Sequence, residues 1–330
     1  MDAISNVRDL GHVAELLRAN DHYVILPHVS PDPDAYGACC GLALLLTRLG
    51  KTVTFYSDEP VPENAEFQNA LFPVTQAAPD LTGKKVIFCD GGERKRLPVA
   101  AREWDIWMNL DHHEGNGNFA THIYQDTAAA ATSLIVARLA RELGVGFDQP
   151  TATCLFGGLL FDTRGGFITD KSNAEVFRTA ADLVEAGARP DLINRAMNEQ
   201  MSMGDFQLYG LALAKLGTAA EGRVVYTYLT AEMLASTGGG DAAMEMLTLN
   251  LPKIAGGEIY VLFKEKKPGL FKLSFRSKGR LAVNTVAAHF DGGGHKFAAG
   301  GAVEGTLDQV IARVMAECEK AVRAELSAAP

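Results

Sequence analysis

The sequence predicts a two-domain α/β protein: an N-terminal domain with a mostly parallel sheet flanked by helices, and a smaller C-terminal α+β domain. Three observations lead to this prediction. The chain has 330 residues, which is more than one hydrophobic core usually fills. Its first half alternates short β-rich runs with helix-length stretches, the pattern of a parallel sheet. Beyond about residue 217 the pattern changes to strands of alternating polarity.

The first half contains four apolar runs that we expect to be buried strands: HYVILP (22–27), KTVTFYS (51–57), KVIFC (85–89) and WDIWMNL (104–110). Between the first two lies an apolar stretch of helix length, closed by Gly50 as a C-cap. A second helix is expected from Thr127 to Leu143. In sheets of this kind, ligands bind at the carboxyl ends of the strands.

The second half begins with two helices expected over 173–199 and broken at Gly187 and Pro190, followed by a connecting helix over 203–217. Strands are expected at RVVYTYLT, EIYVLFKEK and FKLSFRS, and a helix from Leu307 to about Leu326. We therefore predict a first domain over 1–200, a connecting segment over 201–217 and a second domain over 218–330.

Composition limits the class of protein. Hydrophobic residues make up 47% of the chain and charged residues 22%, as in ordinary globular proteins. Because no apolar stretch approaches the length of a membrane span, we expect a cytoplasmic protein without membrane association. The five cysteines show no C-x-x-C spacing, so free thiols are expected rather than disulfides or a zinc knuckle.

Charge is unevenly distributed along the chain. The net charge of -9 argues against binding to long nucleic acid, which requires many basic contacts to phosphates. The segment 264–280, however, holds seven basic residues against one acidic residue, a net +6, so that the remainder carries -15. Solvated basic strands would explain this segment, and so would a site for a small anionic ligand.

Unusual polar residues follow four apolar segments. One such cluster would be explained by a turn or a helix cap. All four are predicted to reach the same edge of the sheet, which turns and caps do not explain. The residues in these four positions are His28, Asp32 and Asp34; Asp90; Asp111, His112 and His113; and Asp162.

Carboxylates gathered at one edge repel one another, and divalent cations offset that repulsion. Carboxylates with a minority of imidazoles suit Mn²⁺ or Mg²⁺ better than they suit thiolate-binding metals. Two such ions can share a water molecule, lower its pKa and stabilise the attacking and leaving oxygens on phosphorus. The pattern therefore predicts hydrolysis of phosphoesters.

The four segments HVSPDPDA, VIFCDGGERKRL, NLDHHEGN and GLLFDTRGGF resemble the four motifs of the DHH phosphoesterases, in the same order. The C-terminal stretch KLSFRSKGRLAVNTVAAHFDGGGHKFAAGG resembles the companion DHHA1 domain. The resemblance covers nearly the whole chain. It implies a DHH catalytic domain over 1–200 and a DHHA1 substrate-binding domain over 218–330. Within the family, the bacterial oligoribonuclease and 3',5'-bisphosphonucleotide phosphatase enzymes are the most similar type.

The resemblance also implies roles for individual residues. One metal ion would be held by His28, Asp32 and Asp90, and the second by Asp34, His112, Asp162 and the shared Asp90. Asp111 would orient its neighbours, and His113 would contact the substrate. The substrate-binding residues of the second domain would be Arg276, Ser277, Gly292, Gly293, Gly294 and His295.

The second domain's motif has a physical interpretation. Three successive glycines allow backbone N–H groups to converge on an anion, while His295 and Arg276 add side-chain donors. Arg96 either supports the metal site or makes a surface ion pair. The loop after Asp162 is one residue longer than the family pattern, which leaves the position of Phe167 open.

We expect a phosphoesterase that uses two divalent ions, Mn²⁺ with Mg²⁺ and Co²⁺ as alternatives. The expected substrates are short oligoribonucleotides, cut to mononucleotides in a cleft between the domains, and adenosine 3',5'-bisphosphate, cut to AMP. One alternative is a phosphodiesterase for cyclic dinucleotides or linear diadenylate, and another is a non-catalytic nucleotide-sensing module. Cleavage polarity, length and base preference, and oligomeric state, a homodimer included, are left open.

Overall fold

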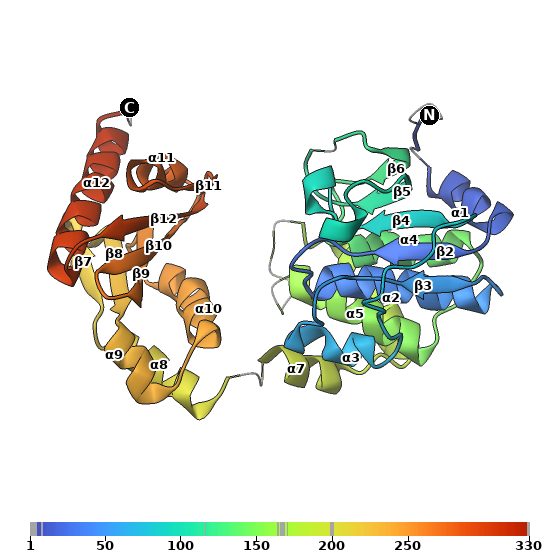
Figure 1. Cartoon of the computed structure of the whole chain (residues 1–330), viewed down its shortest axis with the longest axis horizontal. Coiled ribbons are helices and arrows are strands. Elements are labelled where there is room, and N and C mark those ends of the chain that lie inside the picture. The colour runs from blue at the N-terminus through green and yellow to red at the C-terminus, as the bar shows by residue number, and fades with distance from the viewer. Residues whose placement is uncertain are drawn as a thin grey trace. The chain divides into compact units, whose positions relative to one another are not determined.

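The computed structural model divides the chain into two compact units, Met1–Gln200 and Met201–Pro330 (Figure 1). It describes residues 5–7, 9–115, 117–163, 165, 169, 171–198 and 201–328. Each unit has its own sheet and its own hydrophobic core.

The N-terminal unit is built on a six-stranded sheet with the order β1-β6-β5-β4-β2-β3. All neighbouring strands are parallel. The strands are β1 (Ser5–Asn6), β2 (Tyr23–Leu26), β3 (Val53–Phe55), β4 (Lys85–Cys89), β5 (Ile106–Asp111) and β6 (Ala120–Gln125). Since β5, β4 and β2 are adjacent and parallel, the residues that follow them meet at one edge.

One face of this sheet is covered by helices. They are α1 (Leu10–Ala19), α2 (Pro33–Arg48), α3 (Glu66–Asn69), α4 (Thr132–Glu142), α5 (Gln149–Asp162), α6 (Ala174–Glu185) and α7 (Pro190–Asn198). The apolar helices α2 and α5 are buried on nearly every side and pack against each other, with Leu42 and Leu155 in the main core. This packing fixes the ends of both helices beside the sheet edge.

The opposite face of the sheet carries a second cluster of buried residues. It joins Val24 and Phe88 from the strands to Leu97 and Ala101. Leu97 follows the short 3₁₀ helix η2 (Arg94–Arg96), and Ala101 ends the 3₁₀ helix η3 (Val99–Ala101).

The C-terminal unit contains a mixed six-stranded sheet with the order β11-β12-β10-β9-β8-β7. Its strands are β7 (Gly217–Ala219), β8 (Val224–Leu229), β9 (Ile259–Lys267), β10 (Leu270–Ser277), β11 (Gly293–His295) and β12 (Ala298–Glu304). The β8–β9 pair is parallel, and the other pairs are antiparallel.

Helices lie on both sides of this second sheet (Figure 1). On one side, α11 (Val283–Ala287) and α12 (Leu307–Ala328) bury Phe271, Leu273 and Phe275 of β10. On the other side lie α8 (Met203–Leu213), α9 (Ala231–Thr237) and α10 (Asp241–Asn250), and the helices α8 and α10 pack on Leu229 and Leu262.

The predicted fold class is confirmed, and the seven predicted strands are present with ends shifted by at most two residues. Strand β6 was not predicted, because its residues are mostly half-buried and lack an apolar run. The apolar segment before Asp162 is the end of helix α5, not a strand that reaches the sheet edge.

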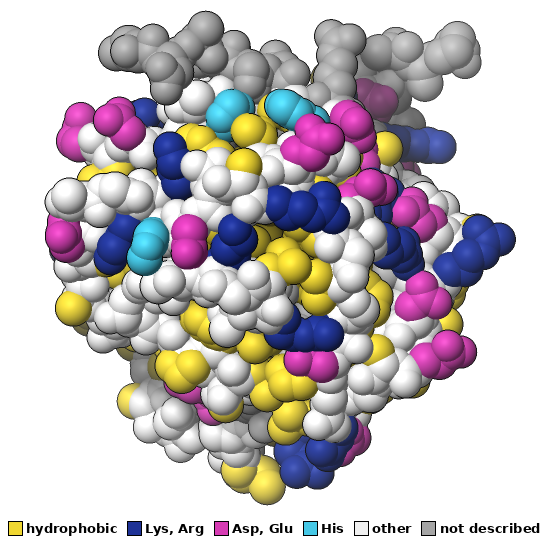
Figure 2. Space-filling model, turned by 90° about the vertical axis from the view of Figure 1, so that its right-hand side faces the viewer, with side chains coloured by type: hydrophobic (Ala, Val, Ile, Leu, Met, Phe, Trp, Pro, Cys, Tyr) yellow, Lys and Arg dark blue, Asp and Glu magenta, His cyan; other side chains and the backbone are white. Residues whose placement is uncertain are grey.

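Within the described residues, no helix is long and apolar enough to cross a membrane. All five cysteines are buried, free thiols, as predicted. On the face of the N-terminal unit seen in Figure 2, acidic and basic side chains are interspersed, and apolar side chains show between them. The described side chains on that face therefore do not form the broad basic surface that long nucleic acid requires.

Candidate metal centre

Four segments bring polar side chains to the carboxyl edge of the parallel sheet. His28 lies two residues beyond β2, Asp90 directly follows β4, and Asp111 ends β5. Asp32 and Asp34 lie at the start of α2, which follows β2. Asp162 reaches the same place from the last turn of α5.

The start of α2 is shaped by its own sequence. Asp32 is the N-cap, and its Oδ1 accepts hydrogen bonds from the backbone N–H groups of Asp34 and Ala35, both at 3.0 Å. Pro33 occupies the first helical position, where no N–H partner is needed. The other carboxylate oxygen, Oδ2, is left to face His28, 3.7 Å from its Nε2.

Asp90 lies between two histidines. Its Oδ2 is 3.5 Å from His28 Nε2, and its Oδ1 is 3.6 Å from His112 Nε2. The backbone of Asp90 is left-handed, with φ of 67°, a conformation that residues other than glycine adopt at a cost. The two oxygens of one buried carboxylate thus face two separate groups of donors.

The second group consists of Asp34, His112 and Asp162. His112 Nε2 lies 3.1 Å from Asp162 Oδ2. The ring is oriented from its other side, where Nδ1 lies 3.2 Å from the carbonyl oxygen of Ala129. Asp34 is fully buried.

Two residues that sequence analysis did not identify hold the carboxylates in place. The backbone N–H groups of Thr132 and Ser133, at the start of α4, donate to Asp34 Oδ2 at 2.7 Å and Oδ1 at 3.0 Å. The hydroxyl of Thr132 donates to Asp90 Oδ1 at 2.7 Å. The helix expected from the sequence began at Thr127, five residues before α4, so the Thr132-Ser133 pair was placed inside a helix and not at the N-terminus where its N–H groups are free to bind.

Gly158 on α5 is the third residue that sequence analysis missed. A Cβ atom at this position would lie 2.6 Å from Asp34 Oδ1 and closer still to Ser133 Oγ. The absence of a side chain therefore allows α5 to approach the Asp34 carboxylate.

Burial and neighbouring charges have opposite effects on the pKa of the two histidines and the same effect on the pKa of Asp34. Burial lowers the pKa of His28, but the carboxylates of Asp32 and Asp90 outweigh it and raise the pKa to about 10. Burial likewise lowers the pKa of His112, while Asp162 and the other nearby carboxylates raise it to about 9. Burial raises the pKa of Asp34 well above its ordinary value, and the negative charges of Asp90 and Asp162 raise it further. The cluster is therefore short of positive charge.

The donor sets fit divalent cations. One ligand atom from each of His28, Asp32 and Asp90 lies within 4.8 Å of the others, and the same holds for Asp34, His112 and Asp162. Nε2 of His112 is buried and makes no hydrogen bond within the described part of the chain. A buried imidazole nitrogen that lies 3.1 Å from Asp162 Oδ2 and 3.6 Å from Asp90 Oδ1, with its opposite ring nitrogen on a carbonyl, has the arrangement of a metal ligand.

His113 differs from its neighbour His112. Its Nδ1 lies 2.8 Å from Oδ1 of the buried Asp111, which raises the pKa of His113 chiefly through that hydrogen bond. Nearly half of the His113 side chain is exposed. Together with Asp90 and His112 it also forms a third group within 4.8 Å. Its ring therefore combines a fixed orientation with access from outside.

Arg96 contacts the site, and within the described residues it makes no surface ion pair. Its NH2 lies 3.0 Å from Nδ1 of His28, and its carbonyl oxygen accepts the backbone N–H of Val29. Arg96 therefore helps to fix the segment that carries His28. Phe167, whose position the longer loop left open, lies outside the described residues.

In the C-terminal unit, Arg276 and His295 lie in one row across the sheet. Arg276 on β10 pairs with Ala298 on β12, which pairs in turn with His295 on β11. Arg276 is half-buried, burial lowers its pKa, and its guanidinium donates to the backbone oxygen of Phe275. Within the described residues it makes no ion pair. Ser277 donates its hydroxyl to Leu281 and so shapes the turn after β10.

The glycines Gly292, Gly293 and Gly294 belong to the tight hairpin of β11 and β12 and do not form an open concavity of N–H groups. The N–H of Gly292 donates to Ala287, so it is not free to bind an anion as the sequence suggested. A Cβ on Gly294 would lie 2.7 Å from the carbonyl oxygen of Ala298, whereas Gly293 is exposed with open space around it. The glycines chiefly allow β11 to approach β12 closely.

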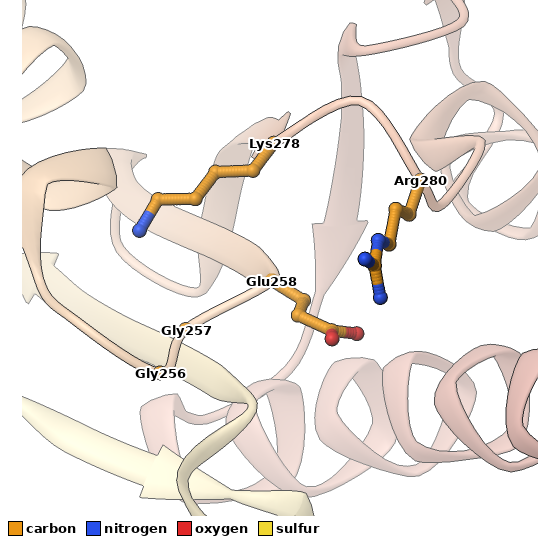
Figure 3. Close-up of a pocket in the computed structure, with 5 residues that line it drawn as sticks. All are labelled: Gly256, Gly257, Glu258, Lys278 and Arg280. Carbon is orange, nitrogen blue, oxygen red and sulfur yellow. The ribbon is translucent and has the colours of Figure 1, made fainter.

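A cavity of about 240 Å³ lies beyond the end of β10 and is lined by Gly256, Gly257, Glu258, Lys278 and Arg280 (Figure 3). Its charged groups are largely engaged. Glu258 is paired with Arg223 at 2.8 Å, and Lys278 donates to Ile254 and lies over the ring of Tyr260. In Figure 3, Lys278 points away from Arg280. These groups do not converge on a ligand.

Comparison with known proteins identifies both units. The N-terminal domain of the DHH family matches residues 22–159, and the DHHA1 domain matches residues 221–324. The chain is 31% identical to the "bifunctional oligoribonuclease and PAP phosphatase NrnA" of Thermus thermophilus, over 96% of this chain and 94% of that protein. It is 24% identical to the Bacillus subtilis protein of the same name, over 93% and 98%.

Among solved structures, the chain resembles an exopolyphosphatase-related protein from Bacteroides fragilis. The TM-score is 0.77 at 24% identity, and the match covers 94% of this chain and 96% of that one. The structural similarity therefore covers both units of this chain.

Proposed function

Because this chain belongs to the DHH family, we propose that it is a phosphoesterase that hydrolyses short oligoribonucleotides to mononucleotides and adenosine 3',5'-bisphosphate to AMP. The proposal is supported by the names of the relatives from Thermus thermophilus and Bacillus subtilis, which align with this chain along nearly their whole length. The donor sets at the carboxyl edge of the parallel sheet support it independently.

The position of Asp90 is the observation that carries the proposal. One of its oxygens faces His28 and the other faces His112, so this carboxylate would belong to both donor sets. His28 and Asp32 complete the first set, and Asp34, His112 and Asp162 the second. Two divalent cations held in this way would lower the pKa of an attacking water and stabilise charge on the phosphoryl oxygens. We infer Mn²⁺, with Mg²⁺ and Co²⁺ as alternatives, from the carboxylate and imidazole donors.

The protein's own groups complete the reaction. Hydrolysis forms a bond from water oxygen to phosphorus and breaks the bond from phosphorus to the leaving oxygen, which then takes up a proton. His113 is the candidate donor, since Asp111 fixes its Nδ1 and raises its pKa while the ring remains half-exposed. A protonated His113 would also stabilise negative charge on the phosphate.

The C-terminal unit would bind the remainder of the substrate. Arg276 and His295 lie in one row of the sheet, and the half-buried guanidinium of Arg276 has no carboxylate partner among the described residues. An Arg in this state is suited to a bidentate contact with phosphate. The five free thiols fit a reducing compartment, so we infer a cytoplasmic site of action.

A substrate panel tests the proposal. Purified protein is assayed with Mn²⁺ on RNAs of two to five nucleotides, adenosine 3',5'-bisphosphate, cyclic diadenylate and linear diadenylate. We expect turnover of the RNAs and the bisphosphate, its loss in Asp90→Ala, and its retention in Asp80→Ala, which removes an exposed acid from a distant loop. Preferential turnover of the diadenylates would reassign the substrate. Binding without turnover of any compound would replace the enzyme with a nucleotide-sensing module.

A further inference from the structure

Strand β10 carries two different rows of side chains. Phe271, Leu273 and Phe275 are buried in the core beneath α11 and α12. Because successive side chains of a strand point to opposite faces, the residues between and after them belong to the other face of the sheet. These are Lys272, which is exposed, and Ser274 and Arg276, which are half-buried.

That other face is only partly covered. Helices α8 and α10 pack on Leu229 of β8 and Leu262 of β9. On β12, the strand at the other side of β10, the residues paired with the row are small: Ala298 beside Arg276, Gly300 beside Ser274 and Ala302 beside Lys272. All three are partly or fully exposed. The row of Lys272, Ser274 and Arg276 therefore has only small residues beside it on β12.

Positive charge collects at the Lys272 end of the row. Lys272 pairs across the sheet with Lys264, whose Nζ donates to Asp241 at 2.8 Å. The pKa of Asp241 is lowered, first by the hydrogen bond from Lys264 and then also by the charges of Lys266 and Lys272. One lysine thus contacts this carboxylate, and the charges of two others act on it from further away. Lys272 makes no ion pair within the described residues. This is part of the basic segment whose purpose the sequence left open.

We propose that Lys272, Ser274 and Arg276 form a track that binds successive phosphates of an oligoribonucleotide. The inference rests on the proposed function and extends it to the length of the substrate. Residues two apart on a strand are separated by about 6.8 Å, a spacing of the same order as that of neighbouring phosphates in an extended single strand. Arg276 would bind the phosphate nearest His295, Ser274 would donate to the next, and Lys272 would bind the third as a point charge.

The track predicts a dependence on substrate length. Adenosine 3',5'-bisphosphate and dinucleotides are too short to extend from Arg276 to Lys272. A 5'-phosphorylated tetranucleotide and a pentanucleotide each carry at least four phosphates, one for the metal centre and three for the track, so they reach both residues and gain the additional contact. The small residues on β12 leave room for the sugars and bases beside the row.

The test compares Lys272→Ala with Lys320→Ala in the full chain. Lys320 is an exposed lysine on α12, which covers the opposite side of the sheet, so its loss changes net charge equally without touching the track. With Mn²⁺, Lys272→Ala should lower the ratio of kcat/KM for the 5'-phosphorylated tetranucleotide to kcat/KM for adenosine bisphosphate about tenfold, the effect of one good contact. Lys320→Ala should leave this ratio as in the wild type.

Direct binding separates failure of the track from failure of the proposed function. Fluorescence anisotropy with labelled RNAs of two to six nucleotides, in EDTA to prevent cleavage, gives the affinity as a function of length and salt. For the tetranucleotide and longer RNAs, Lys272→Ala should reduce the slope of log K against log salt by about 0.7, the value for one phosphate contact to a single strand. Equal slopes in Lys272→Ala and Lys320→Ala would overturn the track even if the wild type cleaves RNA. Absence of RNA cleavage by the wild type would instead reject the proposed function.

Discussion

The sharpest prediction concerns Gly158, where helix α5 meets the buried carboxylate of Asp34. In Gly158→Ala, the added Cβ would lie 2.6 Å from Asp34 Oδ1 and would also overlap Ser133 Oγ. Cβ atoms essentially never approach other heavy atoms within 3.0 Å, so Oδ1 must retreat by at least about 0.4 Å. The metal–ligand distances of a functional site tolerate only about 0.2 Å. The substitution should therefore weaken the binding of metal at the Asp34 group.

The expected effect can be worked through to a measurable quantity. A displaced ligand shell lowers metal affinity about 10- to 100-fold. A metal present at 100 times its Kd stabilises the folded state by about 2.7 kcal/mol, and a 100-fold weaker Kd reduces this to about 0.4 kcal/mol at the same concentration. For a unit of this size, 1 kcal/mol corresponds to a change in Tm of about 2–4 °C. The Mn²⁺-induced rise in Tm should thus fall from about 5–10 °C to about 1 °C.

Gly41→Ala is the matched control. It lies in the same α2–α5 interface, and its added Cβ would overlap the side chain of Leu155 and no metal ligand. Both variants should lose about 1–3 kcal/mol of stability through overpacking, measured by urea unfolding in EDTA. Only Gly158→Ala should lose Mn²⁺ affinity in calorimetric titration.

A second variant separates a loss of stability from a loss of metal binding. Ser133→Ala combined with Gly158→Ala removes the overlap with Ser133 Oγ but keeps the one with Asp34 Oδ1. It should recover stability without recovering Mn²⁺ affinity. If Gly158→Ala folds and binds Mn²⁺ as tightly as the wild type, the reasoning that links this glycine to the metal centre is wrong.

Three further predictions concern the metal centre and the Arg138–Glu175 ion pair. Thr132→Val removes the hydroxyl that donates to Asp90 Oδ1 and should reduce Mn²⁺ affinity about 10- to 100-fold in calorimetry. Thr132→Ser keeps the hydroxyl and should retain the affinity. Equal affinities in both variants would exclude the hydroxyl as a positioning group. In thermal unfolding, EDTA should lower the Tm of the wild type, since the gathered carboxylates then repel one another. Asp90→Ala should abolish this response. An unchanged wild-type Tm would argue against a bound metal. The hydrogen bond from Arg138 lowers the pKa of Glu175, so the stability it contributes is present above the ordinary pKa of 4.5 and is lost as the pH falls through the lower folded value. In urea unfolding at pH 7, Glu175→Gln should therefore be less stable than the wild type by up to about 1 kcal/mol. This difference should disappear in acid, and a difference that does not change with pH would contradict the prediction.

Much of the fold could be predicted because it depends on local pattern. The runs VILP, VIFC and WMNL are apolar and short, which favours buried parallel strands, and each is followed by a polar residue. Strand β6 escaped prediction since its half-buried residues carry no such pattern. The end of α5 was grouped with the strand ends because an apolar run of eight residues does not by itself distinguish a buried helix from a buried strand.

The amino-acid sequence determined that His28, Asp90 and Asp111 stand at the carboxyl edge, because the ends of adjacent parallel strands meet there, whereas Asp162 reaches this edge from helix α5. It also determined the chemical type of the site through its carboxylates and imidazoles. Only the tertiary structure decided how these groups are held. Thr132 and Ser133 reach Asp34 across nearly a hundred residues of chain, and Gly158 matters because of what lies opposite it in space. Such contacts arise from the packing of α4 and α5 against α2, and packing between distant segments leaves no periodic signal in the sequence of any one of them.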